Sequence, residues 1–317
     1  MLTPLNLKEL SKQPELFAPG HRMCTGCGAP IVVRMVMMAA QYPLVVANAT
    51  GCLEVSTSIA EYTSWKTPWI HNAFENAAAT IAGVETMYRS LKKQGKINDE
   101  IRFIAFGGDG GTSDIGFQSL SGAMERGHDM TYICYDNGAY MNTGIQRSSA
   151  TPFGADTATC PVGSESQGKQ QQRKDLTRIM AAHGIPYVAQ ASPNHWQDLM
   201  RKVRKALDIK GPKFINIISP CNRGWRTKTN DAIQLSRLAV ETCYWPLFEI
   251  ENGVTSITVT PREKKPLIEF LKPQGRFKHM FATENAWMLE TAQQHVDACW
   301  DRLQREQTLF VQPGTSE

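Results

Sequence analysis

The 317-residue sequence predicts an α/β fold built on a doubly wound, mostly parallel sheet. Short β-branched or apolar runs alternate with segments whose apolar residues recur three and four positions apart, the spacing of a helix face. Strands and helices that alternate in this way form parallel sheets covered on both faces. The buried strands are expected at residues 43–49, 101–106, 130–135, 185–191 and 213–219.

The segments between these strands are assigned in the same way. Helical periodicity is clearest over residues 74–94 and 195–208. Residues 150–175 are rich in Gly, Pro, Ser, Thr and Gln without a period, which predicts a long loop. Loops of this length inside a compact domain are usually functional.

The pattern changes after residue 240. The Asn252-Gly253 pair between two short apolar runs predicts a β-hairpin, and residues 282–307 predict a terminal helix. We therefore expect a main domain over residues 1–240 and a C-terminal extension over residues 241–317 that packs on it or on a partner subunit.

Composition excludes several classes of protein. Hydrophobic residues make up 42% and charged residues 20%, as in ordinary folded proteins. The net charge of +4 is spread out and no aromatic-interleaved basic stripe occurs, so nucleic-acid binding is not expected. No apolar run reaches membrane-spanning length and the N-terminal stretch lacks the apolar centre of a signal peptide, so no membrane association and a cytoplasmic location are expected.

A glycine-rich turn, "GGDGGTSDIG", follows the predicted strand at 101–106 and precedes a helix-like segment. Backbone N–H groups in such a turn can approach a phosphate closely, and a helix N-terminus adds favourable partial charge. Asp109 would repel that phosphate unless a divalent cation lay between them. Asn137 follows the next strand, and Mg²⁺ prefers oxygen ligands such as these. The pattern indicates a magnesium diphosphate site, although Gly-Gly-Asp-Gly-Gly is also a good turn in itself.

Four of the eight cysteines stand in unusual positions. Cys24 and Cys27 form a CxxC, and Cys52 and Cys221 each follow a predicted strand. The carboxyl ends of parallel strands share one edge, where ligands bind, so Cys52, Cys221 and the Gly-rich turn are expected along it. Four thiolates could hold a zinc ion or an iron–sulfur cluster, and a redox disulfide at the CxxC is a third possibility. Buried thiols without a special role account for Cys134, Cys243 and Cys299, whereas Cys160 in the long loop is not assigned.

These motifs together resemble a known family. An aspartate in a Gly-rich turn, followed 28 positions later by an asparagine, is similar to the thiamine diphosphate motif. The segments "CTGCGAP", "NATGCLEV", "WKTPWIHNAFENAAA", "YDNGAYMNTGIQRS" and "SPCNRGW" add a resemblance, over roughly residues 17–280, to the β subunit of pyruvate:ferredoxin oxidoreductase and other 2-oxoacid:ferredoxin oxidoreductases. The resemblance implies the thiamine-diphosphate-binding type of α/β fold.

The resemblance also implies roles for individual residues. Asp109, Asn137 and the carbonyl of Ala139 match ligands of magnesium, and Asn142 matches an asparagine near the thiazolium and substrate. The diphosphate cradle is matched by Gly108, Gly110 and Gly111. The ligands of a 4Fe-4S cluster are matched by Cys24, Cys27, Cys52 and Cys221.

The implied reaction is the oxidative decarboxylation of a 2-oxo acid, with electrons passed through the cluster to ferredoxin and coenzyme A accepting the acyl group. In this family the glutamate that activates the cofactor lies on a separate α subunit, so an α subunit, and γ and δ subunits with further clusters, are expected partners. Glu54 and Glu75 do not occupy the activating position and are interpreted as structural or interface residues. His71 is interpreted as a packed residue near the interface.

One departure from close pyruvate-type relatives bears on the substrate. Gly138 stands where those relatives often carry glutamate. Loss of a negative charge near the cofactor would favour a substrate with a second carboxylate, so oxalate is an alternative to pyruvate. Two further alternatives are a structural zinc-binding assembly subunit and a thiamine-dependent decarboxylase without redox function.

Overall fold

The computed structural model describes residues 5–59 and 61–309. The first four residues of the N-terminal stretch and the last eight of the predicted C-terminal extension therefore lie outside the described part. The strands are β1 (Leu44–Ala49), β2 (Trp69–Asn72), β3 (Arg102–Gly108), β4 (Thr131–Asp136), β5 (Tyr187–Ala191), β6 (Lys213–Ile218), β7 (Leu247–Glu251) and β8 (Val254–Val259).

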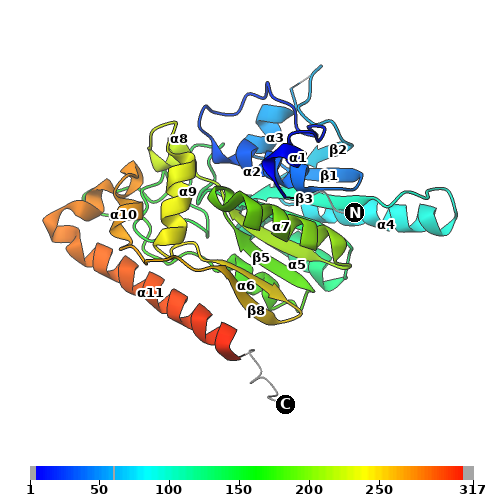
Figure 1. Ribbon diagram of the computed structural model, residues 1–317. Helices are drawn as coiled ribbons and strands as arrows, with labels where there is room; N and C mark the ends of the chain where they lie inside the picture. The colour runs from blue at the N-terminus through cyan, green and yellow to red at the C-terminus, as the bar shows by residue number, and fades with distance from the viewer. Residues whose placement is uncertain (1–4, 60, 310–317) are drawn as a thin grey trace, which may run out of the picture.

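Helices connect these strands and flank the sheet (Figure 1). They are α1 (Leu7–Leu10), α2 (Gly28–Ala39), α3 (Cys52–Thr57), α4 (Ala77–Lys93), α5 (Phe117–Glu125), α6 (Leu176–Ala181), α7 (Trp196–Asp208), α8 (Asn222–Trp225), α9 (Ala232–Glu241), α10 (Ile268–Leu271) and α11 (Ala286–Leu309), with a π-helical turn η1 (Gly111–Ile115) and 3-10 turns η2 (Pro193–His195), η3 (Gly275–Phe281) and η4 (Thr283–Asn285).

The strands form one sheet in the order β2-β1-β3-β4-β6-β5-β7-β8. The first six in this order pair in parallel, whereas β7 pairs antiparallel with β5 and β8 antiparallel with β7. The predicted α/β class with a mostly parallel sheet is therefore confirmed. Because β2 lies on one side of β1 and β3 on the other, the strand order reverses at β1, the kind of position where open α/β sheets bind ligands.

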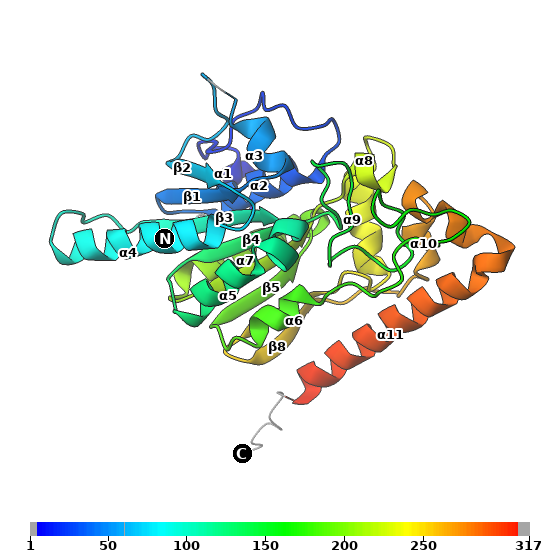
Figure 2. The same cartoon turned by 180° about the vertical axis from the view of Figure 1, so that it is seen from behind.

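The sheet separates two apolar cores because alternate strand residues point to opposite faces. On β3, Phe103 and Ala105 belong to one core, and Ile104 and Phe106 belong to the other. Helices α2 and α7 cover the face of Ile104, and α4, α5, α6 and α11 contribute to the opposite core (Figures 1 and 2). Buried on both faces, the central strands read as continuous apolar runs.

All five predicted strands form within two residues of the expected bounds, and the predicted helices correspond to α4, α7 and α11. The edge strand β2 was not predicted, because four residues of mixed polarity, "WIHN", give no clear alternation. Helix α2 was not anticipated either.

The predicted hairpin is confirmed, with Asn252 at φ 49° and Gly253 at φ 84° in its turn. It continues the main sheet through β7 and β5. The division after residue 240 stays a prediction. Within the described residues, no helix is both long enough and apolar enough to cross a membrane.

The predicted loop at 150–175 forms no helix or strand, apart from isolated bridges. The buried side chain of Lys169 fixes it from inside. Its Nζ donates to the carbonyl oxygens of Ser149 at 3.1 Å and Thr151 at 2.5 Å. Burial lowers the pKa of Lys169 to about 8.

Replacing Lys169 by Met keeps the stem but leaves these carbonyl groups without their donor. We expect Lys169→Met to lower the free energy of unfolding by about 2 kcal/mol, measured by urea denaturation. The control is Lys93→Met on the exposed face of α4, which should change it by less than about 0.5 kcal/mol. Equal losses for the two variants would show that Lys169 does not hold the loop.

Candidate active site

The carboxyl ends of four neighbouring strands carry the residues that the sequence singled out. β1, β3, β4 and β6 are adjacent in the sheet. Cys52 follows β1, Asp109 follows β3, Asn137 follows β4 and Cys221 follows β6. The parallel register therefore gathers side chains that are far apart in the sequence along one edge.

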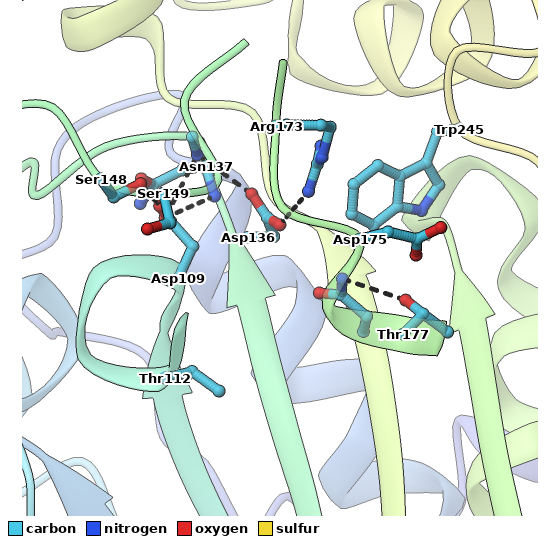
Figure 3. A network of polar contacts seen from close by, with 12 residues as sticks. Asp109, Thr112, Asp136, Asn137, Ser148, Ser149, Arg173, Asp175, Thr177 and Trp245 are labelled. Carbon is cyan, nitrogen blue, oxygen red and sulfur yellow. Dashed lines mark hydrogen bonds and ion pairs between the residues drawn. The ribbon is translucent and has the colours of Figure 1, made fainter. Parts of the chain in front are cut away.

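Asp109 lies fully buried at the centre of this edge. Its Oδ1 accepts hydrogen bonds from the backbone N–H groups of Asn137 at 3.2 Å and Gly138 at 3.1 Å, and its Oδ2 accepts one from the Ser148 hydroxyl at 2.5 Å (Figure 3). Burial, together with the nearby Asp136 carboxylate, raises the pKa of Asp109 from 3.8 to about 7. A positive charge at this position would favour the ionised carboxylate.

The side-chain amide of Asn137 lies between the carbonyl oxygen of Ala139 and Oδ1 of Asp109. The Oδ1 of Asn137 lies 2.9 Å from the carbonyl oxygen of Ala139 and 3.0 Å from Oδ1 of Asp109. Hydrogen bonding in the protein alone favours the amide rotated by 180°, in which its nitrogen donates to both oxygens, whereas a cation bound here would favour Oδ1 in this position. Neighbouring ligands of an octahedral Mg²⁺ with bonds of about 2.0–2.1 Å are about 2.9 Å apart, so these oxygens fit the spacing of magnesium ligands.

A small cavity opens next to these oxygens. Its walls come from the residues that follow β1, β3 and β4, with Phe74 from the segment before α4. Among the lining residues are Cys52, Gly108, Gly110, Gly111, Tyr135, Asn137, Ala139 and Asn142. The residues predicted to contact magnesium, the diphosphate and the thiazolium therefore line one cavity. Asp109 is the exception, because it is buried and is not part of the cavity wall.

Gly110 is required by a neighbouring aromatic ring. A Cβ atom at this position would lie 2.5 Å from the ring of Tyr140, whose hydroxyl donates to the Gly110 carbonyl at 2.9 Å. At Gly108 and Gly111 a Cβ would make only ordinary contacts at 3.4 Å with Tyr135 and Phe74, which also line the cavity. Tyrosine packing therefore explains part of the glycine pattern that the sequence analysis assigned to a phosphate site or to a turn.

A backbone hydrogen bond links the CxxC segment to the segment that contains Cys221. The N–H of Cys27 donates to the Cys24 carbonyl at 3.0 Å, and the N–H of Gly28 donates to the Pro220 carbonyl at 2.9 Å. Gly26, at φ 80°, packs so closely that a Cβ would lie 1.9 Å from the carbonyl oxygen of Thr229.

The four thiols lie close enough to influence one another. Burial raises the pKa of Cys27 and Cys52 to about 12, and it raises the pKa of Cys221 above its usual value. For each of these three thiols, neighbouring thiols of the same set raise the pKa further. Backbone N–H groups at Ala29 and Gly224 act in the opposite direction on Cys27 and Cys221. Bound cationic iron would offset the cost of ionising such thiols.

The remaining cysteines lie elsewhere. In the described part of the chain, no set of three or more His, Cys, Asp or Glu side chains is arranged to hold a single metal ion, so the four thiols form a wider group than the ligand set of one ion. Cys134 and Cys243 are buried, Cys299 contacts His295 at 3.5 Å, and Cys160 is partly exposed in the long loop.

Sequence reasoning assigned no role to three residues that support this edge, which lie in a loop, at the end of β4 and at the end of α8. Besides Ser148, these are Asp136, which accepts from Arg173 at 2.5 Å, and Trp225, whose Nε1 donates to the Asn137 carbonyl at 2.6 Å. Asp136 also accepts from the Gly138 N–H at 3.1 Å (Figure 3). Asp136 could have been noticed in the sequence, because it is a charged residue at the end of a buried strand. Nothing in the sequence identified its partners Arg173 and Gly138.

Gly138 adopts a left-handed conformation, with φ 76°. A Cβ there would approach Nη1 of Arg276 to 3.1 Å. The backbone turn therefore accounts for glycine at this position without reference to substrate charge.

The two candidate glutamates differ in their contacts. Glu54 is nearly buried and lies 2.9 Å from Nδ1 of His71. His71 stacks on Trp69 with ring centres 4.9 Å apart, but about half of its side chain remains exposed. The Glu75 carboxylate lies 3.5 Å from Nδ2 of Asn76, and the Glu75 carbonyl oxygen accepts a hydrogen bond from the Ser119 hydroxyl at 2.6 Å.

Comparisons with known proteins agree with this geometry. The family model "thiamine pyrophosphate enzyme, C-terminal TPP binding domain" matches residues 49–217, more than half of the chain. The chain is 56% identical over 285 residues to the pyruvate synthase subunit PorB of Methanocaldococcus jannaschii, covering 89% of this chain and 94% of that protein. It is 52% identical to the pyruvate synthase subunit PorB of Thermotoga maritima, over 95% of this chain and 96% of that protein.

Other relatives act on different substrates by name. The ketoisovalerate oxidoreductase subunit VorB of Pyrococcus furiosus is 42% identical and covers 98% of this chain and 100% of its own length. A solved 2-oxoglutarate:ferredoxin oxidoreductase from Magnetococcus marinus shares the fold at 20% identity, with a TM-score of 0.53 over 71% of this chain and 78% of that one. The chain belongs to the thiamine diphosphate-dependent 2-oxoacid:ferredoxin oxidoreductases, as a β subunit of that family.

Proposed function

We propose that this chain is the β subunit of a pyruvate:ferredoxin oxidoreductase and holds thiamine diphosphate, Mg²⁺ and a 4Fe-4S cluster. The observation that carries the proposal is that the Asn137 amide lies within 3.0 Å of both the Ala139 carbonyl oxygen and the Asp109 carboxylate, beside a cavity that Asn137, Ala139 and Cys52 line. The two PorB relatives, named as pyruvate synthase subunits, support pyruvate as the substrate.

Asp109, Asn137 and the Ala139 carbonyl would hold Mg²⁺, and its positive charge would favour binding of the diphosphate of the cofactor. Gly108, Gly110 and Gly111 would leave room for the diphosphate. Ser148 and two backbone N–H groups hold the Asp109 carboxylate in place, so it needs little rearrangement when the cation binds.

Bound thiamine diphosphate supplies the chemistry that cleaves the bond between the 2-oxo carbon and the carboxylate. Asn142 lines the cavity and would orient the substrate by hydrogen bonding. Tyr140 covers the Gly-rich turn and, with Phe74, excludes water from that wall.

Cys24, Cys27, Cys52 and Cys221 would ligate the 4Fe-4S cluster. Because Cys52 lines the cofactor cavity and its thiol lies within electrostatic range of Cys24 and Cys221, the two centres would be close neighbours. Electrons would leave through the cluster to ferredoxin, and coenzyme A would accept the acyl group.

An α subunit would complete the site. Glu54 is engaged by His71 and by Ser58, whose hydroxyl lies 3.2 Å from its carboxylate, so this side chain is not free to activate the cofactor. We therefore retain the α subunit as the source of the activating glutamate, and γ and δ subunits as carriers of further clusters.

Magnesium binding is tested by Asp109→Asn, which keeps the shape but removes the charge. We expect Mg²⁺-dependent affinity for thiamine diphosphate, measured by calorimetry, to fall at least roughly 100-fold while the visible spectrum of the cluster is retained. Asp208→Asn on the exposed end of α7 is the control and should bind normally. Retained affinity in Asp109→Asn would reject the role of Asp109.

The same variant also tests how Asp109 affects the pH dependence of folding stability. A carboxyl group whose pKa rises from 3.8 to about 7 on folding binds more protons in the folded state between these values. The wild-type chain without Mg²⁺ and cofactor should therefore lose stability as pH rises from about 4 to 7, and Asp109→Asn should lack this component. Denaturant titrations at several pH values measure the difference; identical pH profiles would contradict the buried charge.

The cluster is tested by colour and by Cys221→Ser. Protein purified without oxygen should be brown with broad visible absorbance that bleaches on reduction, and Cys221→Ser should make the cluster labile. Cys160→Ser, partly exposed outside the four-thiol group, should keep the wild-type spectrum. A colourless wild-type protein with one zinc per chain would support a structural zinc subunit instead.

Substrate preference is tested on the native complex by viologen reduction with pyruvate, oxalate, 2-oxoglutarate and branched 2-oxo acids. We expect pyruvate with coenzyme A to give the highest kcat/KM. Faster turnover of oxalate without coenzyme A would show that oxalate, the alternative that Gly138 suggested, is the substrate instead of pyruvate.

A further inference from the structure

A second, larger cavity of about 270 Å³ lies where α11 packs against the main domain. Figures 1 and 2 show α11 running alongside the part of the molecule that holds α6 and β8. The cavity shares no lining residue with the cavity at the Gly-rich turn. It therefore belongs to neither the cofactor site nor the four-thiol group.

The walls are mostly apolar. Leu176 of α6, Trp245 and Phe248 form one side, and Ala292 and Val296 of α11 form the other. Sites for small molecules are commonly apolar cavities of this size range with a few polar groups that fix orientation. The body of a ligand here would therefore be apolar.

The charged side chains around the cavity are mainly basic. Arg173, Lys174, Arg178 and Arg302 line it, against Asp175 as the one acidic residue of the lining in the described part of the chain. Asp175 is shared, because it lies 3.1 Å from both Arg178 and Arg302. The other basic side chains also have acidic partners: Arg173 pairs with Asp136, Lys174 lies 3.7 Å from Asp114, and Arg178 also pairs with Glu306. An anionic group on a ligand would therefore be recognised by N–H donors that these ion pairs leave unused.

Arg173 fixes one end of the cavity. Its guanidinium lies over the ring of Trp245, 4.7 Å from the ring centre, and donates to Asp136 at 2.5 Å (Figure 3). A second donor, Nη1, lies 3.4 Å from the Tyr244 hydroxyl, and the remaining N–H groups of the guanidinium can meet a carboxylate from the cavity side.

A buried polar atom in the wall lacks a partner. Asn216 is 1% exposed, and its Oδ1 has no hydrogen-bond partner in the described part of the protein. Its Nδ2 donates to Thr177 at 3.3 Å, and Thr177 in turn donates to Gln190 at 2.9 Å. A buried unpaired acceptor is costly, so a donor from a bound molecule would stabilise it.

We infer that this cavity is a ligand site for a small carboxylate with an apolar body and a hydroxyl donor. The carboxylate would meet the basic end at Arg173, the apolar body would lie between Trp245 and Val296, and the hydroxyl would donate to Asn216. Arg173 also pairs with Asp136 at the edge of the proposed cofactor site, but no residue proposed to bind the cofactor, the magnesium ion or the cluster lines this cavity, so the two proposals can be tested separately.

The experiment uses 3-phenyllactate, 3-phenylpropionate and 3-phenylpropanol with the full-length chain in its purified complex. We expect 3-phenyllactate to bind by calorimetry, and the loss of either the hydroxyl or the charge to weaken binding at least roughly tenfold. Equal binding of 3-phenylpropanol would overturn the anionic class, and equal binding of 3-phenylpropionate would overturn the role of Asn216.

A matched pair of variants locates the site on α11. Ala292→Trp fills the cavity and should abolish binding of 3-phenyllactate, whereas Ala298→Trp, on the exposed face of the same helix, should leave it unchanged. Equal affinity of the two variants would place the ligand elsewhere and overturn the proposal.

Labelling of the wild-type protein tests the site without any substitution. Cys299 lines the cavity and Cys160 does not. We expect 3-phenyllactate to slow alkylation of Cys299, followed by mass spectrometry, at least roughly fivefold while Cys160 reacts at its original rate. Unchanged labelling of Cys299 at saturating 3-phenyllactate would also overturn the proposal.

Discussion

A buried carboxylate without an opposite charge in direct contact is the central constraint of this structure. Asp109 is shielded from water and accepts hydrogen bonds only from neutral donors, two backbone N–H groups and Ser148. Neutral donors fix its orientation but do not neutralise it, and the neighbouring Asp136 carboxylate makes ionisation harder still. The Gly-rich turn, the end of β4 and the loop of Ser148 therefore surround a carboxyl group whose ionised form a bound cation would stabilise.

Sheet topology explains why this charge and the thiols share a neighbourhood. β1, β3, β4 and β6 lie side by side and point the same way, although β6 comes late in the chain. Each strand releases its chain at the same edge, so one residue from each of four distant segments arrives there. The Asp136–Arg173 ion pair extends this polar edge toward Trp245 and the second cavity.

The sequence alone predicted the elements whose pattern is local. Buried strands give continuous apolar runs, and Asp109, Asn137, Cys52 and Cys221 could be placed because they directly follow such runs. Ser148 could not be found, because its contact with Asp109 depends on how a loop without periodicity returns to the sheet. The second cavity was equally invisible, since its two walls come from segments joined only by tertiary packing.

The hydrogen bond from Gly28 to Pro220 joins the N-terminal end of α2 to the segment after β6. Gly28 and Pro220 are far apart in the sequence. The hydrogen bond between them can therefore form only after the ribosome has synthesised the segment that follows β6. A cluster held by all four thiols, as proposed, is then inserted only after translation of most of the chain.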